Sequence, residues 1–172
     1  MRNGIVLIGM MGSGKTAVGK AVARRLAWEF IDLDEVITNR AQRSISEVFD
    51  ESGEECFREL ESEALESLLA GDAPAVLATG GGTPMRERNF ELLQQLGKVV
   101  YLRAEPPPLI ARLEGETAHR PLLSGGLRER VEQLLREREP AYRKAHFTVN
   151  ADGEVEDVAA QVIRAVGVAA HE

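Results

Sequence analysis

An eight-residue stretch near the amino terminus constrains the fold of this chain more than any other feature. Residues 9–16 read Gly-Met-Met-Gly-Ser-Gly-Lys-Thr and match the pattern G-x-x-x-x-G-K-S/T. In that pattern, backbone N–H groups surround the phosphates of a nucleotide. A short apolar run at 5–8 precedes the match, and apolar residues at helical spacing follow it. Strand, glycine loop and helix in this order predict a phosphate-binding loop, in which Lys15 reaches the β- and γ-phosphates and the Thr16 hydroxyl can ligate Mg²⁺.

Composition limits the remaining possibilities. The chain has 172 residues, which suits a single domain over 1–172, and its net charge of −7 argues against non-specific binding to nucleic acid. Its one cysteine, Cys56, excludes an internal disulfide and is interpreted as a packed thiol in a helix. No apolar run approaches the length of a membrane span, and none reads as a signal peptide. We therefore expect a cytoplasmic protein that contacts neither membrane nor nucleic acid, and a monomer, since no feature demands a partner protein.

Apolar runs suited to strands alternate with helical patterns along the whole chain. The runs lie at 5–8, 29–33, 75–79, 98–102 and 146–149. Such alternation predicts a three-layer α/β/α fold around a five-stranded parallel sheet. Ligands in such sheets bind beyond the carboxyl ends of the strands, which is where the candidate residues below are expected.

Two acids, Asp32 and Asp34, end the second predicted strand. Residues two apart on a strand point the same way, so one carboxylate can lie near Mg²⁺ and the other near a hydroxyl to be phosphorylated. The alternative is that Asp34 is the N-cap of the helix that follows. The phosphate loop upstream favours the functional interpretation.

Residues 35–70 contain helical patterns with no strand between them, which predicts a small helical lobe over the site, at about 33–61. Ser44 and Glu47 are spaced as a capping box that opens one of these helices. Between Arg43 and Arg86 the single basic residue is Arg58, among ten acids. Arg58 is either a surface residue paired with Glu54 at i,i+4 or an inward-facing clamp for an anionic substrate. Charge alone leaves both interpretations open.

Two further segments fall where a ligand would bind. Three glycines, 80–82, follow the third strand and permit close approach of a ligand to the main chain. The stretch 112–126 has no periodicity from Glu114 to Gly126 and contains Arg120. It is interpreted as a lid that brings positive charge to the transferred phosphoryl group.

Six blocks in order give the chain a resemblance to the shikimate kinase family, in the nucleoside-monophosphate-kinase-like branch of the P-loop proteins. The blocks are Gly9–Thr16, Asp32–Asp34, Phe57–Glu61, Gly80–Gly82, Arg120–Leu123 and Arg138–Tyr142. The resemblance covers nearly the whole chain. It implies transfer of the γ-phosphoryl group of ATP to the 3-hydroxyl of shikimate, a step of chorismate and aromatic amino-acid biosynthesis.

The resemblance also implies a role for each matching residue. It implies that Lys15, Asp34 and Arg120 are catalytic, that Thr16 and Asp32 hold Mg²⁺, and that Arg112 packs on adenine. The implied nucleotide contacts are Gly12, Ser13, Gly14, Lys15, Thr16, Ala17, Arg112 and Arg120. The implied shikimate contacts are Asp34, Phe49, Phe57, Arg58, Glu61, Gly80, Gly81, Gly82 and Arg138, with Arg58 and Arg138 gripping the carboxylate and Glu61 orienting Arg58. The proline expected on the other face of adenine is not present in 150–153.

Two rival functions share some of these features. A gluconate kinase-like enzyme, or another small-molecule P-loop kinase, would have the same fold and phosphate loop, but should lack the Arg58 block combined with the glycines and the Arg138 block. A nucleotide-dependent switch is a different class. A guanine-type switch would carry an N-K-x-D run, and the chain has none.

Overall fold

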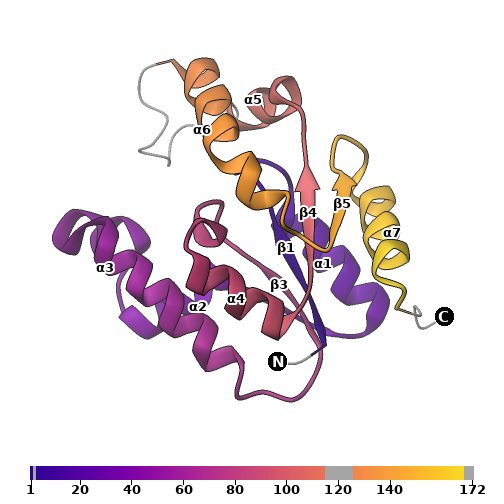
Figure 1. Ribbon diagram of the computed structural model, residues 1–172, viewed down its shortest axis with the longest axis horizontal. Coiled ribbons are helices and arrows are strands. Elements are labelled where there is room, and N and C mark those ends of the chain that lie inside the picture. The colour runs from indigo at the N-terminus through magenta and orange to yellow at the C-terminus, as the bar shows by residue number, and fades with distance from the viewer. Residues whose placement is uncertain (2, 115–125, 169–172) are drawn as a thin grey trace.

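A five-stranded parallel sheet with helices on both faces forms the centre of the molecule (Figure 1). The computed structural model describes residues 1, 3–114 and 126–168. The strands are β1 (Gly4–Ile8), β2 (Glu29–Asp32), β3 (Ala75–Ala78), β4 (Gly97–Arg103) and β5 (Phe147–Asn150), in the spatial order β2-β3-β1-β4-β5. The predicted fold class is confirmed, and each strand end lies within one residue of its predicted position.

The helices lie in the gaps where helical periodicity is found. They are α1 (Lys15–Leu26), α2 (Leu33–Ala41), α3 (Ile45–Leu68), α4 (Glu87–Leu96), α5 (Pro106–Glu114), α6 (Leu127–Tyr142) and α7 (Val155–Val166), with a 3₁₀ turn η1 (Thr83–Met85) before α4. Helix α1 packs against α7, and α4 packs against α3. The chain crosses the sheet in opposite directions through α1 and through α4, so right-handed crossovers place these two helices on opposite faces. None of the helices in the described ranges is long and apolar enough to cross a membrane.

The centre of the sheet is also the centre of the core. Every residue of β1 and β3 is buried, as expected for strands covered on both faces. Strand β1 pairs with β3 on one side and with β4 on the other. The connection after β1 runs toward the β2 edge of the sheet, whereas the connection after β3 runs toward the β5 edge. The carboxyl ends of β1 and β3 are therefore neighbours at the switch point, where the phosphate loop and the glycine loop both begin.

Helices α2 and α3 pack against each other and extend beyond the edge of the sheet, in purple in Figure 1. The predicted capping box opens α3: the Ser44 hydroxyl accepts the Glu47 amide at 3.2 Å, and a Glu47 carboxylate oxygen accepts the Ser44 amide at 2.7 Å. Gly53 interrupts α3 with φ 79°, a conformation that favours glycine, so the helix is kinked there. We call α2 and α3 together the α2–α3 lobe.

Candidate active site

The phosphate loop joins the buried strand β1 to helix α1, in the predicted order. Gly12 and Gly14 have φ angles of 78° and 87°, in the left-handed region where a side chain would be strained. Lys15 is the first residue of α1, and its buried ammonium donates to the carbonyl oxygens of Gly9 and Met10, both at 2.9 Å. The lysine is thus held within its own loop.

The two predicted metal-site residues lie together at the start of the loop helix. The Thr16 hydroxyl donates to Oδ2 of Asp32 at 3.2 Å, while Oδ1 of Asp32 accepts the amide of Asp34 at 3.0 Å. Helix α1 supplies the hydroxyl and the end of β2 supplies the carboxylate, so this hydrogen bond links the start of α1 to the carboxyl end of β2.

The structure corrects the expectation for the pair of acids in one respect. Asp32, not Asp34, is the N-cap of α2, and the helix begins at Leu33. Asp34 therefore lies in the first helical turn, and the two carboxylates do not leave a strand side by side. The strand ends one residue earlier than predicted because the Asp32 side chain satisfies a free amide of the helix.

Three charged residues from different elements meet at the glycine loop, residues 80–82. Each lies close to the position that a Cβ would occupy on one of the glycines: Oδ1 of Asp34 at 3.6 Å from that of Gly80, Nη1 of Arg138 at 3.2 Å from that of Gly81, and Nη2 of Arg58 at 2.5 Å from that of Gly82. The absence of side chains on the loop is therefore what admits these groups. Residues from α2, α3 and α6 converge on one segment of main chain.

Arg58 makes both the surface pair with Glu54 and an inward-facing pair, the two arrangements between which the sequence did not decide. Its guanidinium pairs with the buried Glu61 at 2.6 Å and with the exposed Glu54 at 3.1 Å, and its side chain is 16% exposed. Burial disfavours its charge, but the carboxylates of Glu61 and Glu54 outweigh this and raise the pKa of Arg58. The Glu61 carboxylate also accepts the Thr83 hydroxyl at 2.6 Å, which fixes it from the glycine-loop side. Arg58 is thus a permanent, partly buried cation facing Gly82.

Arg138 approaches the same loop from α6. Its Nη1 atom is buried and has no hydrogen-bond partner among the described residues. One helical turn further, the Tyr142 hydroxyl donates to the Gly81 carbonyl at 2.6 Å. Burial raises the pKa of Tyr142 to about 12, although the neighbouring Arg138 acts against this rise. The phenol is therefore protonated at neutral pH and serves as a donor.

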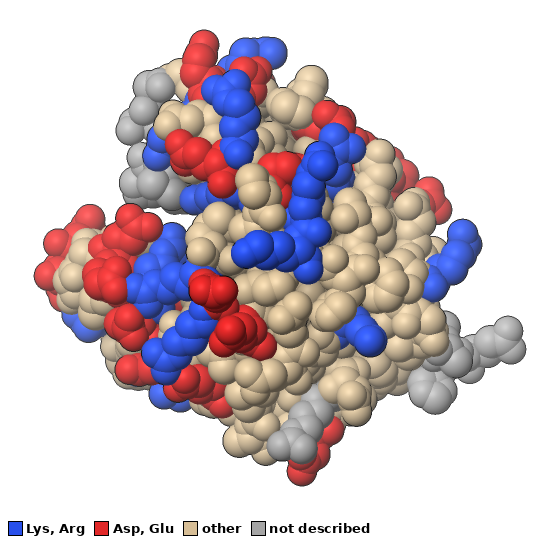
Figure 2. Space-filling view, viewed as in Figure 1, with Lys and Arg blue, Asp and Glu red and all other residues tan. Residues whose placement is uncertain are grey.

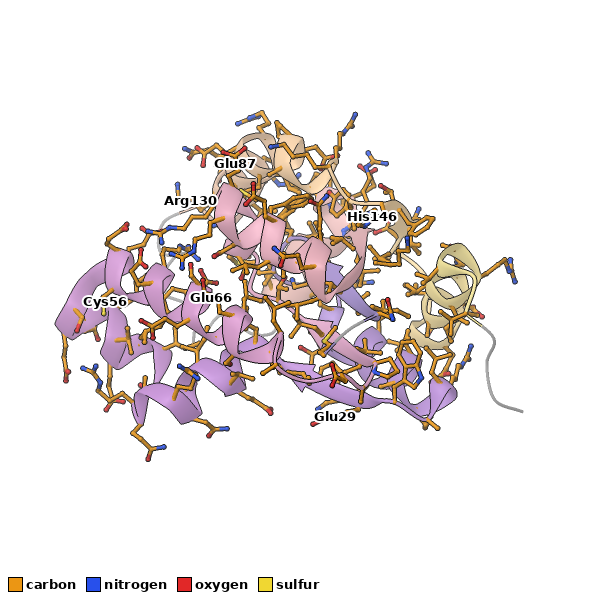
Figure 3. All side chains as sticks on the ribbon, turned by 60° about the horizontal axis from the view of Figure 1, so that its bottom comes forward. Glu29, Cys56, Glu66, Glu87, Arg130 and His146 are labelled. Atoms are coloured by element: carbon orange, nitrogen blue, oxygen red, sulfur yellow. The ribbon has the colours of Figure 1, made fainter. Side chains whose placement is uncertain are left out.

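The aromatic residues expected near the substrate lie in α3. The rings of Phe49 and Phe57 pack with their centroids 4.7 Å apart, and the Arg58 guanidinium lies 5.3 Å from the centre of the Phe57 ring. Cys56 lies on α3 in the same lobe and is half-buried (Figure 3). The Phe57 ring is thus an apolar neighbour of the Arg58 guanidinium.

Charged side chains are concentrated around this part of the molecule. In Figure 2, acidic and basic groups intermingle over the α2–α3 lobe at left, and a notch separates that lobe from the α5 and α6 end at top. Arg86, immediately before α4, pairs with Glu55 and Glu59 of α3, and Arg88 pairs with Glu66. These exposed pairs tie the lobe to α4, and much of the acidic charge of the lobe is neutralised locally.

Of the two arginines expected to contact the nucleotide, the structure describes Arg112 but not Arg120. The guanidinium of Arg112 donates to the Gly12 carbonyl at 3.2 Å and to the Ala151 carbonyl at 3.1 Å, so it links the phosphate loop to the segment after β5. Arg120 and most of the stretch interpreted as a lid, residues 115–125, lie outside the described residues.

The residues present fit a nucleotide and a divalent cation. Within the described residues, three buried side-chain nitrogen or oxygen atoms lack a hydrogen-bond partner, and two of them belong to this site: the hydroxyl of Ser13 in the phosphate loop and Nη1 of Arg138. Buried polar atoms normally have a hydrogen-bond partner, and an anion bound at each position would provide the missing one. A hydroxyl and one carboxylate suit Mg²⁺, which keeps several water ligands. In the described ranges, no group of three or more Asp, Glu, His or Cys side chains is arranged to hold a metal ion.

Sequence reasoning missed Tyr142 and Thr83, although both lie in or beside recognised blocks. Tyr142 is four residues after Arg138, so helical spacing puts both on one face of α6. That spacing was the available signal, but the partner of its hydroxyl is a backbone carbonyl, which no sequence pattern marks.

The fold, the phosphate loop and the converging charged groups define a P-loop kinase. A family model described as shikimate kinase matches residues 11–167. The chain belongs to the shikimate kinase family.

Individual members of the family align with this chain over most of their length. The chain is 42% identical to the shikimate kinase of Thermodesulfovibrio yellowstonii, covering 95% of this chain and 94% of that one. Its identity to the shikimate kinase of Geobacter sulfurreducens is 45%, covering 92% and 87%. The structure superposes with a TM-score of 0.88 on the shikimate kinase from Acinetobacter baumannii in complex with shikimate, at 35% identity, covering 95% and 92%. A gluconokinase from Sinorhizobium meliloti, with a TM-score of 0.69 at 20% identity and 97% and 94% coverage, shares the fold.

Proposed function

We propose that this chain transfers the γ-phosphoryl group of ATP to the 3-hydroxyl of shikimate, forming shikimate 3-phosphate and ADP. The observation that carries the proposal is the meeting of Asp34, Arg58 and Arg138 at the glycine loop. Two guanidinium groups and one carboxylate around a loop without side chains suit a small ring that bears a carboxylate and hydroxyls. Family membership supports the same substrate.

The phosphate loop holds the donor. The backbone of residues 9–16 surrounds the phosphates, and Lys15 releases its contacts with the Gly9 and Met10 carbonyls to pair with phosphate oxygens. Thr16 would bind Mg²⁺ directly and Asp32 through a water; the ion supplies charge neutralisation at the phosphates. The hydroxyl–carboxylate contact at 3.2 Å already brings these two groups together.

The charged groups at the glycine loop hold the acceptor. Arg58 and Arg138 bind the carboxylate, and Asp34 orients the hydroxyl and takes its proton as the new oxygen–phosphorus bond forms and the bond from phosphorus to the β,γ-bridging oxygen breaks. Asp34 need not be a strong base, because the proton leaves late in a loose transition state. Positioning and charge neutralisation therefore account for most of the catalysis.

A substrate panel tests the proposal. Purified protein with ATP and Mg²⁺ is incubated with shikimate, quinate, gluconate, AMP or CMP, and ADP release is followed in a coupled assay. We expect turnover with shikimate well above the rate with water alone. Turnover with gluconate or a nucleoside monophosphate in place of shikimate would show a different small-molecule kinase, and slow hydrolysis unaffected by any of the acids would show a nucleotide-dependent switch.

A further inference from the structure

The last residue of α6, Tyr142, contacts the glycine loop in a way that neither the motif nor the proposed chemistry explains. Its side chain is fully buried, and its hydroxyl donates to the Gly81 carbonyl at 2.6 Å. Arg138 lies one helical turn before it, and Nη1 of Arg138 is buried without a partner among the described residues. Tyr142 and Arg138, one helical turn apart on α6, thus both lie against Gly81 of the loop.

A second tyrosine supports the ring of the first without sharing its contact. The rings of Tyr101 and Tyr142 are stacked, with centroids 5.0 Å apart and planes inclined by 29°. The Tyr101 hydroxyl donates instead to Glu139 at 2.5 Å, and Glu139 also accepts Arg143 at 3.0 Å. The Tyr101 hydroxyl therefore braces α6 against β4 and does not touch the glycine loop.

The hydrogen bond at Gly81 has two consequences for the loop. A trans peptide is planar, so fixing the Gly81 carbonyl also fixes the direction of the Gly82 amide N–H, which points the opposite way. The bond also gives a partner to a carbonyl oxygen of the residue beside which Arg138 lies. Without the phenol, the Gly81 carbonyl would lose this hydrogen bond in a buried setting, and Nη1 of Arg138, which lies 3.2 Å from the position that a Cβ on Gly81 would occupy, is a donor beside the same residue.

We propose that Tyr142 is a positioning residue for recognition of the substrate carboxylate. Its hydroxyl occupies the Gly81 carbonyl, keeps Nη1 of Arg138 available to an anion and holds the Gly81–Gly82 peptide in one orientation. This inference rests on the proposed function, because the anion is taken to be the carboxylate of the phosphoryl acceptor.

The test removes one oxygen atom. In Tyr142→Phe the ring and its stacking on Tyr101 remain, and the hydroxyl is lost. We expect the KM for shikimate to rise about tenfold, the effect of losing a buried hydrogen bond that orients a charged group, while kcat and the KM for ATP stay within about twofold. The matched control is Tyr101→Phe, which removes the other hydroxyl of the stacked pair and should leave the KM for shikimate within about twofold.

A neutral substrate analogue separates positioning from general damage to the fold. With the methyl ester of shikimate, the acceptor lacks the anionic group, so Tyr142→Phe should change its KM little. A KM for the acid that is unchanged in Tyr142→Phe would overturn the proposal, as would equal increases for the acid and the ester. Melting temperatures of both Phe variants, measured first, show whether either is poorly folded; Tyr142→Trp then serves as a second, indole-bearing variant, and its KM for the acid should again rise more than that for the ester.

Failure of this inference is distinguishable from failure of the proposed function. If the wild-type protein releases no ADP with shikimate, the proposed function fails. If the wild type turns over shikimate and the Tyr142→Phe variant does so with the same KM, only the positioning role fails.

Discussion

Gly82→Ala is the substitution whose effect the structure specifies most closely. Gly82 has φ −90° and ψ −13°, which alanine adopts without backbone strain. The added Cβ would lie 2.5 Å and 2.9 Å from the two terminal nitrogens of Arg58 and 3.0 Å from its Cζ, whereas ordinary contacts begin at 3.4 Å. The guanidinium must therefore move by about 0.9 Å, the difference between 3.4 and 2.5 Å.

Arg58 cannot absorb that displacement freely. One side of its guanidinium pairs with Glu61, whose side chain is fully buried and also bonded to Thr83, and the Phe57 ring lies nearby. A shift of about 1 Å at a substrate-positioning group costs up to about 100-fold in rate, and a hydrogen bond to a charged group contributes about 1.5–3 kcal/mol. We expect kcat/KM for shikimate to fall about 10- to 100-fold in Gly82→Ala. The KM for ATP should stay near the wild-type value, because the phosphate loop is a separate segment.

A double-mutant cycle shows whether the effect passes through Arg58. The assay is ADP formation with shikimate varied at saturating ATP, for the wild type, Gly82→Ala, Arg58→Ala and the double variant. We expect Arg58→Ala alone to raise the KM for shikimate, and the added Gly82→Ala to cause little further loss, because the displaced group is absent. Losses that multiply in the double variant, or a single Gly82→Ala variant within twofold of the wild type, would refute the reasoning.

Three further predictions concern the phosphate loop and the α2–α3 lobe. Lys15→Ala should reduce turnover to background, and near-normal activity in the coupled ADP assay would contradict its assignment. Thr16→Val should raise the Mg²⁺ concentration needed for half-maximal rate about tenfold or more, measured by Mg²⁺ titration at fixed ATP; an unchanged requirement would exclude a metal ligand there. The backbone hydrogen bond from Ser44 lowers the pKa of Glu47, so the carboxylate stabilises the fold above its usual pKa of 4.5 and loses this effect as the pH falls through the lowered value. Glu47→Gln should therefore melt about 1–3 °C lower than the wild type at pH 7 but show a shrinking difference toward pH 3, and a deficit that persists in acid would argue against the charge.

The fold was predictable because its signals are local and repeated. Each strand is a short apolar run between helical patterns, and the phosphate loop fixes the first strand–helix connection. The capping box was equally readable, because Ser44 and Glu47 are only three residues apart. The start of α2 was less clear, because either Asp32 or Asp34 was chemically able to cap the helix, and the choice depends on where β2 ends.

The substrate side of the site could be read only in part. Charge left the direction of Arg58 open, because its pairing with Glu54 at i,i+4 is compatible with either a surface or an inward position. The structure shows both that pair and the buried pair with Glu61. The contact between Tyr142 and Gly81 joins residues 61 apart in the sequence, and it needed the packing of α6 against the loop to become visible.

The acidic surroundings of Arg58 are compatible with its proposed role in binding an anion, because its two carboxylate partners are not equivalent. Glu61 is fully buried, 2.6 Å away and held by Thr83, so it is a fixed support that orients one edge of the guanidinium. Glu54 is 69% exposed and 3.1 Å away, so its pairing with Arg58 is weak and screened by water and salt. A substrate carboxylate entering beside Gly82 can replace the exposed partner without disturbing the buried one. Glu61 and Glu54 thus keep the arginine charged, and the pair that substrate binding would replace under the proposed function is the weaker of the two.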